Sequence, residues 1–158
     1  MKLKQKFRIS ILNNLESLNS KFEKELREIF ESGFSKEVTF LQIEYESQTF
    51  ERDFSVCLYA VDREGQLVGK LYWFLKDIAF VIPDEMYYAE AYSEEEYEDI
   101  DPWNIASDIL ESWLMERWKK VDTKDMSAYL AHHDFHFVKN IENGMTTNWN
   151  EIIGQKNG

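Results

Sequence analysis

Only one cysteine occurs among the 158 residues of the chain, so no disulfide can form within it. Cys57 lies in an apolar run that includes Val56 and Leu58, and such a residue is expected to be a buried core thiol rather than a nucleophile. A chain without disulfides fits a reducing compartment. We therefore expect a cytoplasmic protein.

Long hydrophobic segments are also missing. The densest apolar stretch, from Leu71 to Ile82, is interrupted by Lys76 and Asp77 and falls short of the roughly 18 residues that a transmembrane helix needs. The N-terminal residues alternate polar and apolar side chains and form no continuous apolar core of an export signal. We expect neither a membrane partner nor secretion.

The sequence signatures of common catalytic and nucleotide-binding sites are absent. The six glycines form neither of the two glycine patterns typical of phosphate-binding loops, and no G-x-S-x-G nucleophile elbow occurs. We therefore expect no cofactor, and a binding protein rather than an enzyme.

The length and composition fit one folded domain over residues 1–158. A chain of this size buries roughly 70% of the surface that its unfolded form exposes. With 44% hydrophobic and 15% aromatic residues, the chain has enough apolar side chains to form a core despite its many charges.

Two helices are predicted by apolar periodicity and capping residues. Apolar residues recur every three or four positions from Ile11 to Phe30, which predicts one helix with a single buried stripe, begun by Ser10 and ended by Gly33. The stripe consists of Ile11, Leu12, Leu15, Leu18, Phe22, Leu26, Ile29 and Phe30. A second, long helix is predicted over about 101–121, because a capping aspartate followed by proline precedes another apolar stripe. Trp113 and Trp118 fall on or beside that stripe, and we expect them to pack in the core.

The remaining patterned segments are typical of strands. They cover residues 38–46, 54–61, a third strand from about Leu67, and then 128–132, 135–141 and 145–149. Residues 62–65 and Asn143-Gly144 are predicted turns, whereas residues 70–80 also fit a short helix. Two helices with about five or six strands, mostly antiparallel, predict an α+β fold.

Basic residues are absent from one quarter of the chain. No lysine or arginine occurs between Asp77 and Glu116, and 13 carboxylates fall in this base-free span. The net charge of the whole chain is −12, so the rest of the sequence is close to neutral. Because such a charge repels phosphate backbones and anionic lipids, we expect no nucleic acid and no membrane as a direct partner.

Tyrosines are interleaved with the acids of the base-free span. A tyrosine supplies a rigid ring with a polar tip, which suits a protein interface. The predicted binding residues for a basic protein partner are Tyr92, Glu94, Glu95, Glu96, Tyr97, Glu98, Asp99 and Trp103. A solvated acidic surface that only keeps the chain soluble explains the same pattern, and both interpretations stay open.

All three histidines fall within five residues. On a strand, His132, Asp134 and His136 would project from one face, and two imidazoles with a carboxylate are a known ligand set for iron or zinc. Three ligands on one short strand seldom reach the same ion, because alternate residues are nearly 7 Å apart. A metal-binding protein or a metal-dependent enzyme that uses these three residues is therefore the alternative hypothesis, and a hydrogen-bonded histidine cluster is preferred.

The outline of the chain resembles the small acidic bacterial immunity proteins that neutralise toxins. The likeness rests on size, acidity and the segment from Tyr92 to Trp118, in which an acidic stretch leads into the Asp101-Pro102-Trp103 helix. It implies a non-enzymatic cytoplasmic inhibitor whose acidic surface covers a basic toxin surface, often that of a nuclease.

Overall fold

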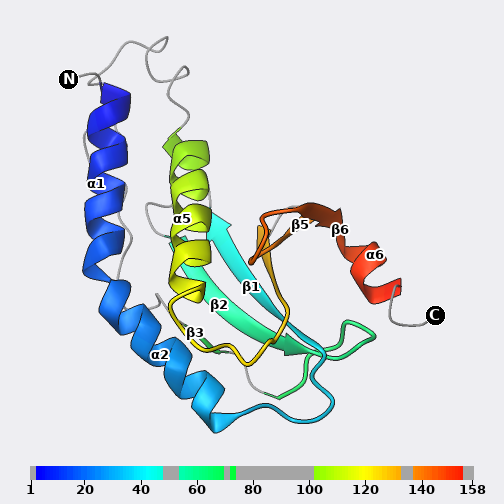
Figure 1. Cartoon of the computed structure of the whole chain (residues 1–158). Coiled ribbons are helices and arrows are strands. Elements are labelled where there is room, and N and C mark those ends of the chain that lie inside the picture. Colours follow the sequence, from blue (N-terminus) through cyan, green and yellow to red (C-terminus); the bar gives the residue numbers. More distant parts are fainter. Residues whose placement is uncertain (1–2, 48–53, 70–71, 74–101, 133–136, 155–158) are drawn as a thin grey trace.

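The computed structural model describes residues 3–47, 54–69, 72–73, 102–132 and 137–154. Its helices are α1 (Leu3–Ser17), α2 (Asn19–Ser32), α5 (Pro102–Trp118) and α6 (Trp149–Gly154). Its strands are β1 (Phe40–Ser47), β2 (Phe54–Val61), β3 (Tyr72–Trp73), β4 (Ala128–His132), β5 (Phe137–Asn140) and β6 (Thr146–Asn148). The prediction of an α+β fold is confirmed (Figure 1).

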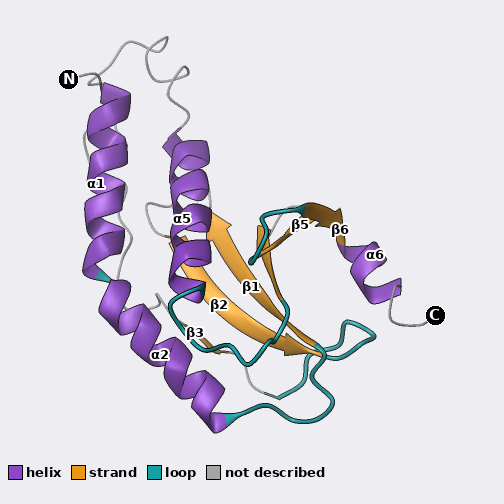
Figure 2. Ribbon diagram, viewed as in Figure 1, coloured by secondary structure: helices purple, strands orange, loops and turns teal. Residues whose placement is uncertain are grey.

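The strands form one sheet in the order β3-β2-β1-β4-β5-β6. Every neighbouring pair is antiparallel except β1 and β4, which run parallel with Leu41 opposite Ala128 and Tyr45 opposite His132. The prediction that antiparallel pairing dominates is therefore confirmed, and the parallel pair at the centre was not foreseen. Helices α1, α2 and α5 cover one face of this sheet (Figure 2).

The N-terminal helical region differs from its prediction. The helix begins at Leu3 instead of Ile11, so Ser10 lies inside α1 and caps nothing, and the chain breaks at Leu18 before α2. The break falls where Ser17, Asn19 and Ser20 crowd together, and these side chains compete with the helix for backbone hydrogen bonds. The predicted end is confirmed: α2 stops at Gly33, whose φ is +75°.

The strand predictions agree closely with the structure. β2 and β4 have the predicted bounds, and β1 begins two residues later than predicted. β5 is described from Phe137, since residues 135–136 of its predicted range lie outside the described residues, and Leu67 pairs with Val61 where the third strand was expected to begin. Tyr72 and Trp73 are strand, while the rest of the ambiguous 70–80 segment lies outside the described residues. Residues 149–154 form α6, which the sequence did not predict.

Turn 62–65 shows why a glycine is needed at its end. The Asp62 carboxylate accepts hydrogen bonds from the backbone amides of Glu64 and Gln66, and Gly65 has φ +83°. A Cβ at Gly65 would lie 2.7 Å from Ile153 Cδ1, so glycine also permits the close approach of α6.

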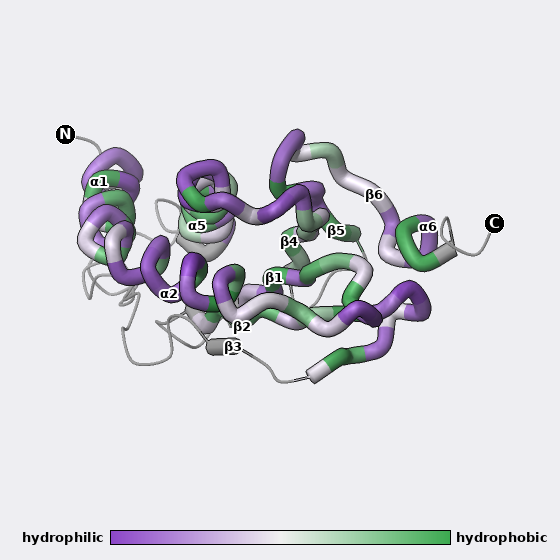
Figure 3. Tube along the Cα trace, turned by 60° about the horizontal axis from the view of Figure 1, so that its bottom comes forward, coloured by the Kyte–Doolittle hydropathy of each residue, from purple (hydrophilic) through white to green (hydrophobic). Residues whose placement is uncertain are grey.

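Buried side chains form two clusters on opposite faces of the sheet. The larger cluster joins α1, α2 and α5 to β1, β2 and β4, and it contains both Trp113 and Trp118, as predicted. The smaller cluster is centred on Phe40, whose ring lies 5.7 Å from that of Tyr129 and 5.3 Å from that of Trp149. Figure 3 shows hydrophobic and hydrophilic residues alternating along α1 and α2, as expected of helices with one buried side.

Cys57 is buried, in agreement with the prediction of a core thiol. Its Sγ lies 3.7 Å from the backbone oxygen of Glu44. Among the helices that the structure describes, none combines the length and the apolar character needed to cross a bilayer.

Candidate interaction surface

The C-terminal part of the base-free span is helix α5. Of the predicted binding residues, Trp103 lies in the first turn of this helix. The other seven, which are Tyr92, Glu94, Glu95, Glu96, Tyr97, Glu98 and Asp99, lie outside the described residues. The part of the predicted surface that can be examined is therefore α5 and the helices beside it.

The three acids of the span in the described part of α5 have different surroundings. Asp108 and Glu116 are exposed, whereas Glu111 is half-buried between the helix and the sheet. Bases from outside the span neutralise two of them, because Lys139 Nζ lies 2.5 Å from Glu111 Oε2 and Arg117 Nη2 lies 2.7 Å from Glu116 Oε1. Asp108 forms no ion pair with a described residue.

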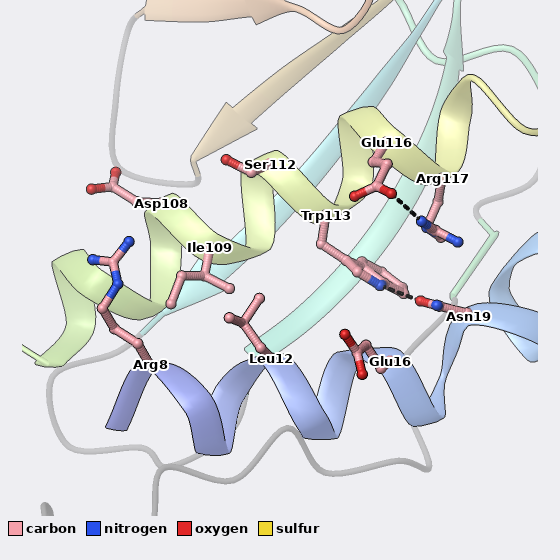
Figure 4. A pocket seen from close by; sticks show the side chains of 10 residues that line it. All are labelled: Arg8, Leu12, Glu16, Asn19, Asp108, Ile109, Ser112, Trp113, Glu116 and Arg117. Carbon is pink, nitrogen blue, oxygen red and sulfur yellow. Dashed lines mark hydrogen bonds and ion pairs between the residues drawn. The ribbon is translucent and has the colours of Figure 1, made fainter. Parts of the chain in front are cut away.

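A surface groove of about 580 Å³ runs between α1 and α5. The lining residues are Arg8, Leu12, Glu16, Asn19, Asp108, Ile109, Ser112, Trp113, Glu116 and Arg117 (Figure 4). Its walls are open to solvent, since Leu12 is 44% exposed and the Glu116 side chain is 64% exposed. The shape is that of a shallow channel rather than an enclosed cavity.

The two helices present matching rows of side chains to this groove. On α1, Arg8, Leu12 and Glu16 follow each other at intervals of four residues, so they lie on one side of the helix. On α5, Asp108, Ser112 and Glu116 form the opposite row in the same way. In Figure 4, Arg8 and Asp108 stand at one end of the groove and Glu16 and Glu116 at the other.

The floor of the groove is fixed by contacts with the first turn of α2. Trp113 Nε1 donates a hydrogen bond of 2.6 Å to Asn19 Oδ1, and its ring packs against Phe22 at 5.0 Å. Arg117 Nη1 binds Glu23 Oε1 at 3.0 Å, and its side chain is largely buried. Because these partners hold Trp113 and Arg117 in place, the groove is preformed on its α5 side.

A polar cluster lies between α5 and the sheet. The Tyr45 hydroxyl on β1 donates a hydrogen bond to Glu111 Oε1, and Lys139 on β5 pairs with the other oxygen of the same carboxylate. Burial raises the pKa of Tyr45 well above its ordinary value, and the hydrogen bond to Glu111 and the negative charges of Glu111 and Asp108 raise it further. Through Tyr45 and Lys139, Glu111 joins α5 to β1 and β5.

The raised pKa of Tyr45 predicts a loss of stability at high pH. An unfolded tyrosine ionises near pH 10, whereas folded Tyr45 keeps its proton. The free energy of unfolding is thus unaffected by this group below about pH 10 and falls above it by about 1.4 kcal/mol per pH unit. Urea unfolding at several pH values from 9 to 11 should show a flatter decline for Tyr45→Phe than for the wild type. Equal slopes would contradict the raised pKa.

The metal hypothesis stays a prediction. His132 is the last residue of β4, and Asp134 and His136 lie outside the described residues. Within the described part of the chain, no group of three histidine, cysteine or acidic residues is placed to hold a metal ion.

The contribution of α1 to the groove was missed in the sequence, because Leu12 was assigned to the buried stripe. The structure buries Phe7, Ile11 and Leu15, but leaves Leu12 44% exposed. Ile11 and Leu12 stand about 100° apart around the helix, so two adjacent apolar residues need not share its buried side. The sequence carried no signal that separates the two cases, because Ile29 and Phe30 are adjacent in the same way and are both buried.

Known proteins offer no guide to this surface. No protein-family model, no curated protein and no solved structure matches the chain.

Proposed function

We propose that the chain is a non-enzymatic cytoplasmic binding protein that neutralises a basic protein partner, in the manner of a bacterial immunity protein. The observation that carries this proposal is the base-free span, which holds 13 carboxylates in a chain whose net charge is −12. Like charges at this density repel one another unless a cationic surface neutralises them. A partner rich in lysine and arginine meets that condition.

The described part of the span supports a docking role. α5 is anchored to the sheet through Glu111 and to α2 through Trp113 and Arg117, so the acids that it exposes are carried on a rigid element. A preorganised surface loses less conformational entropy on binding than a mobile one. Charge complementarity would also accelerate association with the partner, and this effect weakens as salt screens the charges.

The direct test reverses three acids of the predicted binding surface. The variant E94K/E95K/E96K is expected to bind a basic partner about a hundredfold more weakly than the wild type, because like charges then face each other across the interface. The partner is first captured from the native cell at low salt, and its affinity for both chains is then measured by calorimetry at 50 and 500 mM salt.

A matched control separates the location of the charges from their number. Glu28, Glu31 and Glu37 are exposed and lie outside the base-free span, so E28K/E31K/E37K changes the net charge equally. This control should bind within a few-fold of the wild type. If the captured partner arrests growth when expressed alone, co-expression of the wild type and the control should restore growth, and E94K/E95K/E96K should not. A partner that binds all three chains equally, without dependence on salt, would refute the proposal.

A further inference from the structure

We infer that the groove between α1 and α5 receives a basic amphipathic helix of the partner, with a lysine or arginine placed between Glu16 and Glu116 and an apolar side chain on Leu12. This inference rests on the proposed function and specifies where, on the described surface, the basic partner is held.

The charges at the two ends of the groove favour a cationic occupant at one end. Arg8 and Asp108 stand together at the first end, where their charges are opposite. At the second end lie Glu16 of α1 and Glu116 of α5; Glu116 points toward Arg117, and Glu16 forms no ion pair with a described residue. Among the residues that line the groove, the base at this end is Arg117, which is already shared by Glu23 and Glu116. A cation at this end would therefore be attracted by Glu16, an exposed carboxylate that no described base neutralises.

The apolar part of the groove explains why a bare cation is not the best occupant. Leu12, which lines the groove, is 44% exposed. An apolar side chain laid on Leu12 would remove this surface from water, which stabilises a complex by roughly 25 cal/mol per Å² buried. The occupant therefore needs both an apolar and a cationic side chain.

The spacing of the groove residues fits a helix. Leu12 and Glu16 are four residues apart, and so are Ser112 and Glu116, so each wall repeats once per helical turn. From Arg8 to Asn19 the groove extends about 16 Å, which is three turns of helix. A partner helix that carries an apolar residue and a lysine four positions apart matches both features, as in other helix-in-groove complexes.

The test uses a synthetic helical peptide of alanine, leucine and lysine, with leucine and lysine four residues apart. Its labelled form should bind the wild type in fluorescence anisotropy at 50 mM salt. Leu12→Ser and Glu16→Lys should each weaken binding about tenfold. The matched controls Leu67→Ser and Glu31→Lys alter an equally exposed leucine and an exposed glutamate outside the groove, and should change the affinity less than twofold. Replacing the lysines of the peptide by glutamate, or its leucines by serine, should also reduce binding.

Amide chemical shifts then locate the peptide. Shifts confined to residues 8–19 and 108–117 support the groove. Shifts confined to residues 77–101, with Leu12→Ser binding as tightly as the wild type, would overturn the groove assignment and leave the proposed function intact. Failure of every cationic peptide to bind at low salt would count against both. Dimerisation of the free chain that Leu12→Ser abolishes would show that a second copy occupies the groove, and would also overturn the inference.

Discussion

Replacing Trp113 by alanine is expected to lower the free energy of unfolding by about 4 kcal/mol, since large-to-small substitutions of buried aromatic residues cost roughly 3–5 kcal/mol. The side chain is only 6% exposed, its ring packs against Phe22, and its Nε1 donates a hydrogen bond to Asn19. Alanine would remove the ring, leave a cavity between α5 and α2, and leave the Asn19 side chain without its donor.

Trp113→Phe is the control that separates packing from hydrogen bonding. Phenylalanine keeps an aromatic ring against Phe22 and loses the donor to Asn19, so a smaller cost of about 1–2 kcal/mol is expected. Urea unfolding followed by far-ultraviolet circular dichroism measures both values. A cost below 1 kcal/mol for Trp113→Ala would mean that the junction of α5 with α2 contributes little to stability.

Glu111→Ala is expected to cost about 3 kcal/mol, because it removes from a partly buried polar cluster the carboxylate that the Tyr45 hydroxyl and Lys139 both bind. The Tyr45 hydroxyl is buried, and Lys139 on β5 would lose its only ion pair among the described residues. Because the Lys139 side chain is one third exposed, water can solvate its ammonium group after the ion pair is lost. The loss of stability therefore falls at the lower end of the range for breaking buried ion pairs.

The matched experiment replaces the whole cluster with apolar groups. In Tyr45→Phe/Glu111→Leu/Lys139→Met no polar atom of the three side chains remains to be satisfied, so stability should return to within about 1 kcal/mol of the wild type. Urea unfolding of the single and the triple variant compares the two cases directly. If the triple variant were as unstable as Glu111→Ala, the polar cluster would contribute a net stabilisation that apolar side chains cannot replace.

The elements that could be predicted from the sequence are those determined by neighbouring residues. The bounds of β2 follow from an apolar run that ends at turn 62–65, and the stop of α2 follows from Gly33. α5 was predicted from a proline at its first position and from its apolar stripe, although it ends at Trp118, three residues before the predicted end. In each case the residues that determine where the helix or strand begins or ends lie within a few positions of that point.

The features that were missed depend on contacts between distant segments. The parallel alignment of β1 with β4 is set by packing under α5 and leaves no local signature. α6 is only six residues long, too short for apolar periodicity to reveal, and it is held by Ile152 in the second cluster. For the candidate surface, the sequence identified the acidic character of α5, but α1, which forms the groove with it, lies about 100 residues earlier.

The central parallel pair also bears on the order in which the chain folds. Strands β1 to β3 come from the N-terminal half and β4 to β6 from the C-terminal half, and in the described sheet only β1 and β4 join the two halves. The hairpin of β5 and β6 closes a loop of a few residues, whereas pairing Leu41 with Ala128 closes a loop of about 90, at an entropic cost of roughly 4 kcal/mol. Each half can therefore form its hairpins early, and docking of the halves along β1 and β4 is the slow, high-contact-order step of folding.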